Sequence, residues 1–207
     1  MRYPVVTREE MYALDQRMTD QFGISSQVLM ENAANAVFNV LRMQFPDLVE
    51  KRILVVTGPG HNGEDGLVLS RILKIHQVHT EVLILAASEK WKKSYEEKVR
   101  TIRLLGTPLH IQEFPVALEF DIIIDGIFGI GLSRKPEGIF KNAIQYINQS
   151  NAFVVSLDIP SGIEANTGET YGDSVHCHIC VSFGLIKVGN CINNGYTHCE
   201  ELYWSPL

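Results

Sequence analysis

Short apolar runs alternate with stretches of helical periodicity along most of this chain. A continuous apolar run of about four to eight residues is typical of a strand buried on both faces, whereas apolar residues three and four apart indicate a helix. We therefore expect strands within residues 53–56, 80–87, 120–129, 152–157, 181–184 and 200–204, and helices from residue 67 onward, over 90–105 and over 141–148. This alternation predicts an α/β fold with a largely parallel sheet.

Two helices are expected before the first strand. Thr7 and Glu10 fit a capping box at the start of the first helix, and residues 25–45 carry the apolar spacing of the second. The residues expected on its buried face are Val28, Leu29, Ala33, Val37, Val40 and Leu41. Glu31 and Asn32 are interpreted as a solvated edge.

A glycine-rich turn, GPGHNGEDG, joins the strand at 53–56 to the next helix. Its glycines (Gly58, Gly60, Gly63 and Gly66) can adopt dihedrals closed to other residues and leave room for backbone N–H groups to converge on one anion. We expect Asp65 to cap the helix. The alternatives are an anion-binding turn and a tight turn with no ligand.

Two nucleotide-binding motifs can be compared with this turn. Gly58, Gly60 and Gly63 fit G-x-G-x-x-G, but the acidic residue expected about 20 positions later is matched only loosely by Glu81 or Glu89. A P-loop is excluded, because Glu64 and Asp65 stand where Lys and Ser/Thr would be required.

Composition fits one α/β domain over residues 1–207. The net charge is −6 with scattered basic residues, which argues against nucleic acid or an anionic membrane as partner. No apolar run approaches the roughly 18 residues of a membrane span. The first residues do not resemble a secretory signal, so we expect the cytoplasm or another reducing compartment such as the mitochondrion.

Four cysteines lie near the end of the chain among several histidines, which raises the possibility of a zinc site. Cys177 and Cys180 fall within an expected strand, where an odd separation would point the two thiols to opposite faces. We therefore favour reduced, structural thiols over a metal site or disulfides.

Three apolar strands end in polar or glycine-rich loops. The carboxyl ends of parallel strands lie along one edge of a sheet, where ligands bind. Asn62, Asp125, Asp158 and Ser161 should therefore meet at this edge. Two aspartates beside glycine turns favour a ligand site over simple loop caps.

The chain resembles the YjeF N-terminal domain family in five ordered motifs: LMENAA, GPGHNGEDGLVLSRIL, DGIFGIGLSR, SLDIPSGIEANTG and VSFGLIKVG. The resemblance implies a Rossmann-like three-layer α/β/α sandwich that commonly dimerises. It also implies an NAD(P)H-hydrate epimerase, which interconverts the R and S forms of NADHX and NADPHX at C6 of the nicotinamide ring.

The resemblance also assigns residues. It implies a potassium ion held by Asn62, Asp125 and Ser161, with Asp158 as the catalytic residue, and an amide, a carboxylate and a hydroxyl are suitable oxygen donors for a hard cation. Lys187 is a lesser candidate for orienting substrate, since a lysine after a strand is usually solvated. The residues implied to bind substrate are His61, Asn62, Gly63, Glu64, Asp65, Gly129, Ile130, Gly131, Leu132, Ser133, Arg134, Lys135 and Asp158.

The sequence departs from the usual family motifs at four positions: Ala34, His61, Glu64 and Ile130. Glu64 replaces a glycine and could repel a phosphate unless its side chain points outward. We expect ligand binding to survive these changes.

Other readings of the chain remain open. A non-catalytic family member, such as the scaffold modules of decapping enhancers or the apolipoprotein A-I binding proteins, is one alternative, and a nicotinamide-dependent dehydrogenase is another. The companion ATP- or ADP-dependent dehydratase domain is not recognisable in the sequence, so we expect a separate dehydratase as pathway partner.

Overall fold

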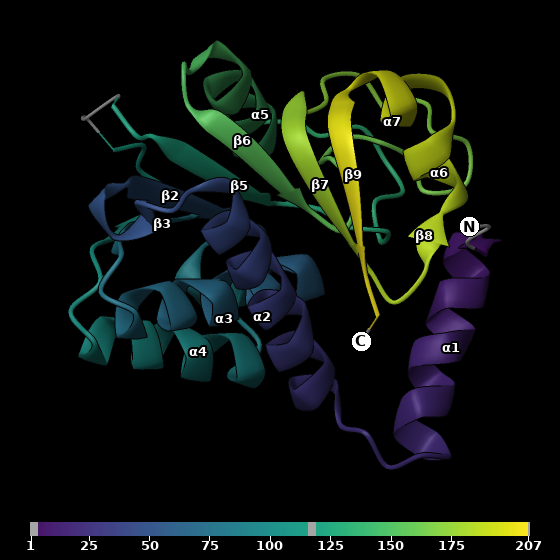
Figure 1. Cartoon of the computed structure of the whole chain (residues 1–207), viewed down its shortest axis with the longest axis horizontal. Helices are drawn as coiled ribbons and strands as arrows, with labels where there is room; N and C mark the ends of the chain where they lie inside the picture. The colour runs from purple at the N-terminus through teal and green to yellow at the C-terminus, as the bar shows by residue number, and fades with distance from the viewer. Residues whose placement is uncertain (1–3, 116–118, 207) are drawn as a thin grey trace.

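The fold is built on a seven-stranded sheet in which every neighbouring pair of strands is parallel (Figure 1). The computed structural model describes residues 4–115 and 119–206. The strands, in spatial order, are β4 (Leu109–Ile111), β3 (His79–Ile84), β2 (Arg52–Thr57), β5 (Ile122–Gly126), β6 (Phe153–Leu157), β7 (Cys177–Phe183) and β9 (Cys199–Ser205). All six predicted strands are confirmed. Strand β4, which is only three residues long, was not predicted.

Helices cover both faces of the sheet, which confirms the three-layer α/β/α architecture. Ile53 and Val55 pack towards α2 (Ser26–Gln44), α3 (His61–Ile75) and α4 (Lys93–Leu104), below the sheet in Figure 1. Leu54 and Val56 face α5 (Ile139–Gln149) on the other side. Because successive side chains of each strand enter different cores, a buried strand reads as a continuous apolar run.

The N-terminal segment lies apart from these layers. Helix α1 (Arg8–Asp20) has Met11 as its only buried residue, and Figure 1 shows it standing beside the sheet. The predicted Thr7–Glu10 capping box is confirmed. A short strand before α1, β1 (Val5–Val6), pairs with β8 (Ile186–Lys187).

The second helix buries five of the six apolar residues expected on its inner face. The expectation for Val28 was wrong, because this residue near the start of α2 is 48% exposed. The short elements are the 3₁₀ turns η1 (Leu48–Glu50) and η2 (Ser88–Lys90) and the helices α6 (Val188–Cys191) and α7 (Asn193–Thr197).

The odd spacing of Cys177 and Cys180 predicted that their thiols would point to opposite faces of the sheet, and this prediction was wrong. Both thiols lie in the hydrophobic cluster beside α5. The pairing of β7 with β6 begins only at Ile179. Just before it, the Nδ1 atom of His178 accepts a hydrogen bond from Val154 N–H. The alternation of side chains between the two faces of β7 is therefore broken at this point. All four cysteines are free thiols.

Candidate functional site

A cleft of about 680 Å³ opens where the strand order reverses between β2 and β5. This reversal is the usual ligand position in an open parallel sheet. The loops after β2 and β5 form its floor together with Asp158, Phe183 and Lys187, while α1 and the first half of α2 form walls. Asn62 and Asp158 lie in this cleft, at the sheet edge predicted from the sequence.

The glycine-rich turn delivers the N-terminus of α3 to the cleft. The helix begins at His61, six residues earlier than the apolar spacing suggested, and no side chain caps it at Gly60. Asp65 therefore lies in the second turn, and the expectation that it would cap the helix was wrong. The uncapped first-turn N–H groups remain available to an anion.

The glycines of this turn are required for close backbone approach and not for unusual dihedrals. None of Gly58, Gly60, Gly63 and Gly66 has a positive φ, contrary to expectation. A Cβ atom on Gly63 would lie 2.0 Å from the carbonyl oxygen of Gly58, and one on Gly58 would lie 1.9 Å from that of Ile127. The turn is therefore packed tightly against the loop that follows β5.

Asp125 and Ser161 form a buried hydrogen-bonded pair. Ser161 donates its backbone N–H and its hydroxyl to the Asp125 carboxylate at 2.9 and 2.5 Å, and the Ser156 hydroxyl donates at 2.8 Å. Burial raises the pKa of Asp125, although these hydrogen bonds oppose the shift. Within residues 4–115 and 119–206, no lysine or arginine forms an ion pair with this carboxylate.

Asn62 lies next to this pair. If Gly129 carried a Cβ atom, that atom would lie 3.3 Å from the side-chain Oδ1 atom of Asn62. A Cβ atom on Gly126 would lie 3.2 Å from the backbone oxygen of Asn62. The Asn62 Nδ2 atom is buried and has no hydrogen-bond partner among the residues that the structure describes. The amide of Asn62, the carboxylate of Asp125 and the hydroxyl of Ser161 offer oxygens that suit a hard cation, and this carboxylate has no cationic partner among the described residues. No group of three or more His, Cys, Asp or Glu side chains suited to a metal occurs in the part of the chain that the structure describes.

Asp158 and Lys187 form a buried ion pair at the floor of the cleft. The Lys187 ammonium also donates to the carbonyl oxygen of Phe183 at 2.7 Å, and the Phe183 N–H donates to the Asp158 carboxylate at 3.2 Å. Asp158 has φ of +70°, a strained conformation that clusters at functional sites. Lys187 is 1% exposed, so the sequence expectation of a solvated lysine was wrong.

The side chain of Glu64 leaves the cleft. Its two carboxylate oxygens accept hydrogen bonds from Ser94 Oγ at 3.0 Å and Lys98 Nζ at 2.6 Å on α4. Only 3% of Glu64 is exposed. The residue that seemed set to repel a phosphate therefore links two helices instead.

The segment from Gly129 to Lys135 divides in two. Gly129, Ile130, Gly131 and Leu132 line the cleft, as does the exposed His61. The other three side chains, Ser133, Arg134 and Lys135, are exposed and do not line the cleft.

Sequence reasoning missed the contribution of α1. Tyr12 and Asp15 line the cleft, and the Tyr12 hydroxyl lies 3.2 Å from the position of a Cβ atom on Gly131. Burial raises the pKa of Asp15, and the Asp158 charge adds to this shift. Burial also raises the pKa of Asp65, again with Asp158 contributing. The helical spacing of Tyr12, Asp15 and Thr19 was the available signal.

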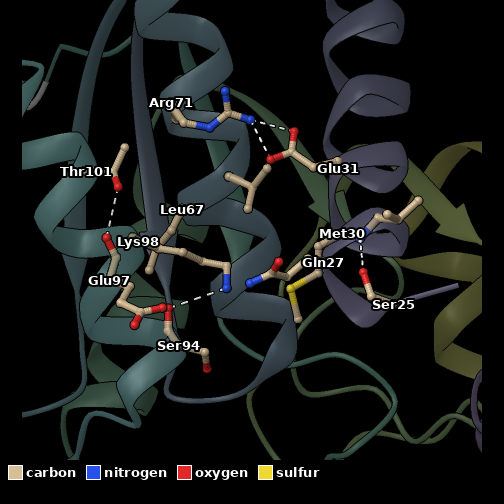
Figure 2. A pocket seen from close by; sticks show the side chains of 12 residues that line it. Ser25, Gln27, Met30, Glu31, Leu67, Arg71, Ser94, Glu97, Lys98 and Thr101 are labelled. Atoms are coloured by element: carbon tan, nitrogen blue, oxygen red, sulfur yellow. Dashed lines mark hydrogen bonds and ion pairs between the residues drawn. The ribbon is translucent and has the colours of Figure 1, made fainter. Parts of the chain in front are cut away.

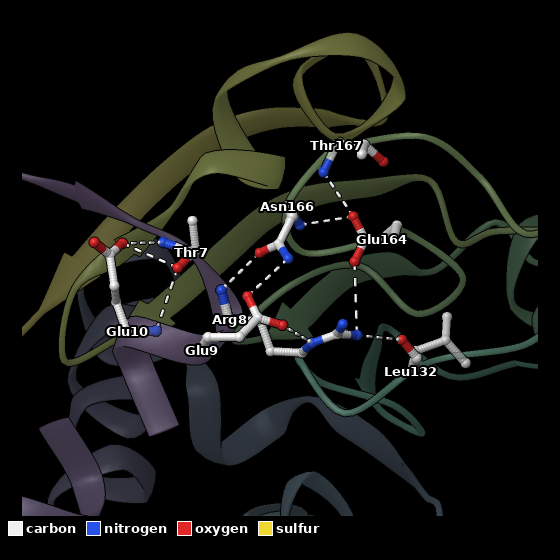
Figure 3. Close-up of polar contacts among 8 residues, drawn as sticks. All are labelled: Thr7, Arg8, Glu9, Glu10, Leu132, Glu164, Asn166 and Thr167. Atoms are coloured by element: carbon white, nitrogen blue, oxygen red, sulfur yellow. Dashed lines mark hydrogen bonds and ion pairs between the residues drawn. The ribbon is translucent and has the colours of Figure 1, made fainter. Parts of the chain in front are cut away.

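A polar cluster attaches α1 to the loops of the site (Figure 3). Arg8 Nη1 lies 3.6 Å from Glu164 Oε1 and donates to the carbonyl oxygen of Leu132 at 3.3 Å. The Arg8 N–H donates to Asn166 Oδ1 at 2.7 Å, and Asn166 Nδ2 donates to Glu9 at 2.9 Å. Arg8 therefore joins α1 to the same segment that lines the cleft.

A second hollow, of about 480 Å³, lies between α2, α3 and α4 (Figure 2). Its cations are already paired, because Arg71 donates to both oxygens of Glu31 at 2.6 and 2.5 Å and Lys98 pairs with Glu64. It lacks the strand ends and glycine turns of the first cleft. None of the described helices is long and apolar enough to span a membrane.

Comparisons with known proteins agree with this geometry. The family model described as YjeF-related protein N-terminus matches residues 26–189. The NAD(P)H-hydrate epimerase of Limosilactobacillus reuteri (strain DSM 20016) is 35% identical over 191 residues, which cover 92% of this chain and 89% of the relative.

Two other matches extend the comparison. The bifunctional NAD(P)H-hydrate repair enzyme Nnr of Dictyoglomus turgidum is 35% identical over 190 residues, but the match covers only 36% of that longer protein. The crystal structure of yeast ynu0, YNL200c, aligns with a TM-score of 0.84 at 25% identity, covering 96% of this chain and 88% of the yeast chain. The chain therefore belongs to the family of YjeF-related protein N-termini.

Proposed function

We propose that this protein is an NAD(P)H-hydrate epimerase, an isomerase that interconverts the R and S forms of NADHX and NADPHX. The observation that carries the proposal is the buried Asp158–Lys187 ion pair at the floor of a cleft bounded by the glycine-rich turn. Relatives that match over most of their length bear this enzyme name, among them that of Limosilactobacillus reuteri.

The reaction inverts the configuration at C6 of the nicotinamide ring, the carbon that carries the hydroxyl group. One path expels the hydroxyl as water and returns water to the opposite face of a ring cation; another opens and recloses the ring. Asp158 is suited to both, because a carboxylate paired with Lys187 at the floor of the cleft can stabilise positive charge in the ring and accept a proton.

The phosphates of the substrate would bind at the turn regions of the cleft. The uncapped N-terminus of α3 offers N–H groups, and Gly129 and Gly131 leave backbone accessible on the facing loop. The Glu64 carboxylate does not oppose this binding, since it is bonded to α4.

A potassium ion would be held by Asn62, Asp125 and Ser161. When bound, it would supply positive charge beside the Asp125 carboxylate, which has no ion-pair partner among the described residues. This ion, a homodimer and a separate dehydratase partner belong to the proposal as family expectations. A non-catalytic scaffold is the second candidate, and the intact pair of Asp158 and Lys187 argues against it.

The test follows the ratio of R to S NADPHX by chromatography, with potassium present, against the spontaneous rate. The wild-type protein should accelerate interconversion, and Asp158→Asn should lose roughly 100-fold or more of that acceleration. A folded, potassium-loaded wild-type protein that gives no acceleration over buffer would overturn the proposal in favour of the scaffold.

A further inference from the structure

Two carboxylates line the cleft from different parts of the fold. Asp158 follows β6 at the sheet edge, whereas Asp15 belongs to α1. Inversion at one carbon removes a hydroxyl group from one face of the ring and adds water to the other. A proton is therefore needed on one face and a proton acceptor on the opposite face, which one carboxylate on the α1 wall and one at the floor of the cleft can supply.

The surroundings of Asp15 favour its neutral form. It is partly buried and makes no hydrogen bond or ion pair with another side chain in residues 4–115 and 119–206. Desolvation raises its pKa, as does the charge of Asp158, while Lys187 and His61 oppose the shift. Asp65 on α3 is the other acidic group that interacts with it, and Tyr12 is its neighbour on α1.

The surroundings of Asp158 differ from those of Asp15. Its carboxylate accepts hydrogen bonds from the Lys187 ammonium and the Phe183 N–H, and both stabilise negative charge. Both partners are hydrogen-bond donors, so the geometry places Asp158 as an acceptor. One carboxyl group without a bonded side chain and one bonded to two donors, in the same cleft, fit an acid and a base working together.

We propose that Asp15 is the general acid on one face of the nicotinamide ring and Asp158 the proton acceptor on the other. The inference rests on the proposed epimerase function and adds a residue from α1 to its chemistry.

The atoms and electrons balance without a further reactant. The Asp15 carboxylic acid gives its proton to the C6 hydroxyl oxygen, the C6–O bond breaks with its electron pair leaving on water, and the ring nitrogen lone pair forms the N1–C6 double bond. A water then bonds to C6 from the other face and gives a proton to Asp158. Exchange with solvent returns a proton to Asp15 and removes one from Asp158, and the reverse reaction exchanges the two roles.

The test measures kcat and KM for NADPHX against pH, with the spontaneous rate subtracted at each pH. The wild-type kcat should fall as pH rises through the pKa of Asp15, because the acid must be protonated. Asp15→Asn should lower kcat about 100-fold or more with KM changed less than about threefold, and should lose this alkaline limb. Asp15→Glu should restore part of the rate, and Asp47→Asn, the same change at an exposed position between α2 and β2 outside the cleft, should behave as wild type.

Folding is checked separately by thermal unfolding. Asp15 has a raised pKa in the folded protein, so its ionisation costs stability as pH rises through that pKa. Asp15→Asn removes this cost and should be at least as stable as wild type near neutral pH. A loss of activity in this variant therefore reports chemistry and not unfolding.

The outcomes separate the two proposals. An Asp15→Asn protein that keeps the wild-type rate and alkaline limb overturns the role of Asp15 while the epimerase function stands. Loss of the limb in Asp65→Asn but not in Asp15→Asn also overturns it and makes Asp65 the acid. A wild-type protein without acceleration overturns the function itself.

Discussion

Glu64 occupies a position where the family usually has glycine, yet its carboxylate lies outside the cleft. Both of its oxygens are bonded to α4, and the Lys98 partner is itself only 16% exposed at its side chain. The charge at this position is therefore a structural link between α3 and α4. Its effect should appear in stability and not in substrate affinity.

Glu64→Gln should lower the free energy of unfolding by roughly 2 kcal/mol, because the change leaves the largely buried Lys98 ammonium without its counter-charge. Urea unfolding measures this loss, and KM for NADPHX should stay unchanged. The matched control is Glu97→Gln on exposed surface of α4, which should stay within about 0.5 kcal/mol of wild type. A clear fall in KM for Glu64→Gln would contradict this account, since it would mean that the charge repels substrate.

At the scale of elements, α1 forms a wall of the cleft but is weakly packed. Met11 is its only buried residue, so its position depends on the β1–β8 pairing and on the polar cluster around Arg8. An element held by few buried contacts opens at low free-energy cost. Arg8 matters doubly, because it also bonds the loop after β5 through the carbonyl oxygen of Leu132.

Arg8→Met should therefore loosen both α1 and that loop while the sheet stays folded. We expect KM for NADPHX to rise about three- to tenfold, and faster proteolysis at the connection between α1 and α2, with a small change in Tm. Arg17→Met on the exposed face of the same helix, where Arg17 donates to Gln21 and lies over the exposed Phe22 ring but does not bond the loops of the site, should leave both readouts at wild-type values. Equal proteolysis of the two variants would show that Arg8 does not hold the helix.

At the scale of the whole molecule, the sheet and its layers followed from the sequence because buried parallel strands leave continuous apolar runs. The glycine-rich turns and the aspartates at strand ends then located the site, since parallel strands share one edge. Short segments such as β4 carry too little pattern to detect. The break in β7 at His178 depends on a side-chain contact with β6, which no local pattern encodes.

The parts of the site that could not be predicted depend on tertiary contacts between distant residues. Lys187 looks like any lysine after a strand until the fold brings it against Asp158. Asp15 belongs to a largely exposed helix, and it becomes part of the cleft only because the fold places α1 along one wall of it. The direction of Glu64 was also left open, because its partners lie 30 or more residues away on α4.

The buried carboxylate of Asp125 makes the stability of the whole protein a readout for the proposed potassium ion. The desolvation that raises its pKa would be offset by a cation bound between Asn62, Asp125 and Ser161. A ligand that binds only the folded state stabilises it by about 2.7 kcal/mol at a hundred times its Kd. We therefore expect Tm to rise with potassium chloride, relative to choline chloride at equal ionic strength.

The same measurement on two variants separates the site from a general salt effect. Asp125→Asn should lose the potassium-dependent rise, because it removes the negative charge that binds the ion. Asp121→Asn should keep it, since Asp121 lies just before the opposite end of β5, where it accepts a hydrogen bond from Arg52 N–H. Identical Tm values for the wild type in potassium and choline would contradict a cation at Asp125, and an equal rise in Asp125→Asn would assign the effect to bulk salt.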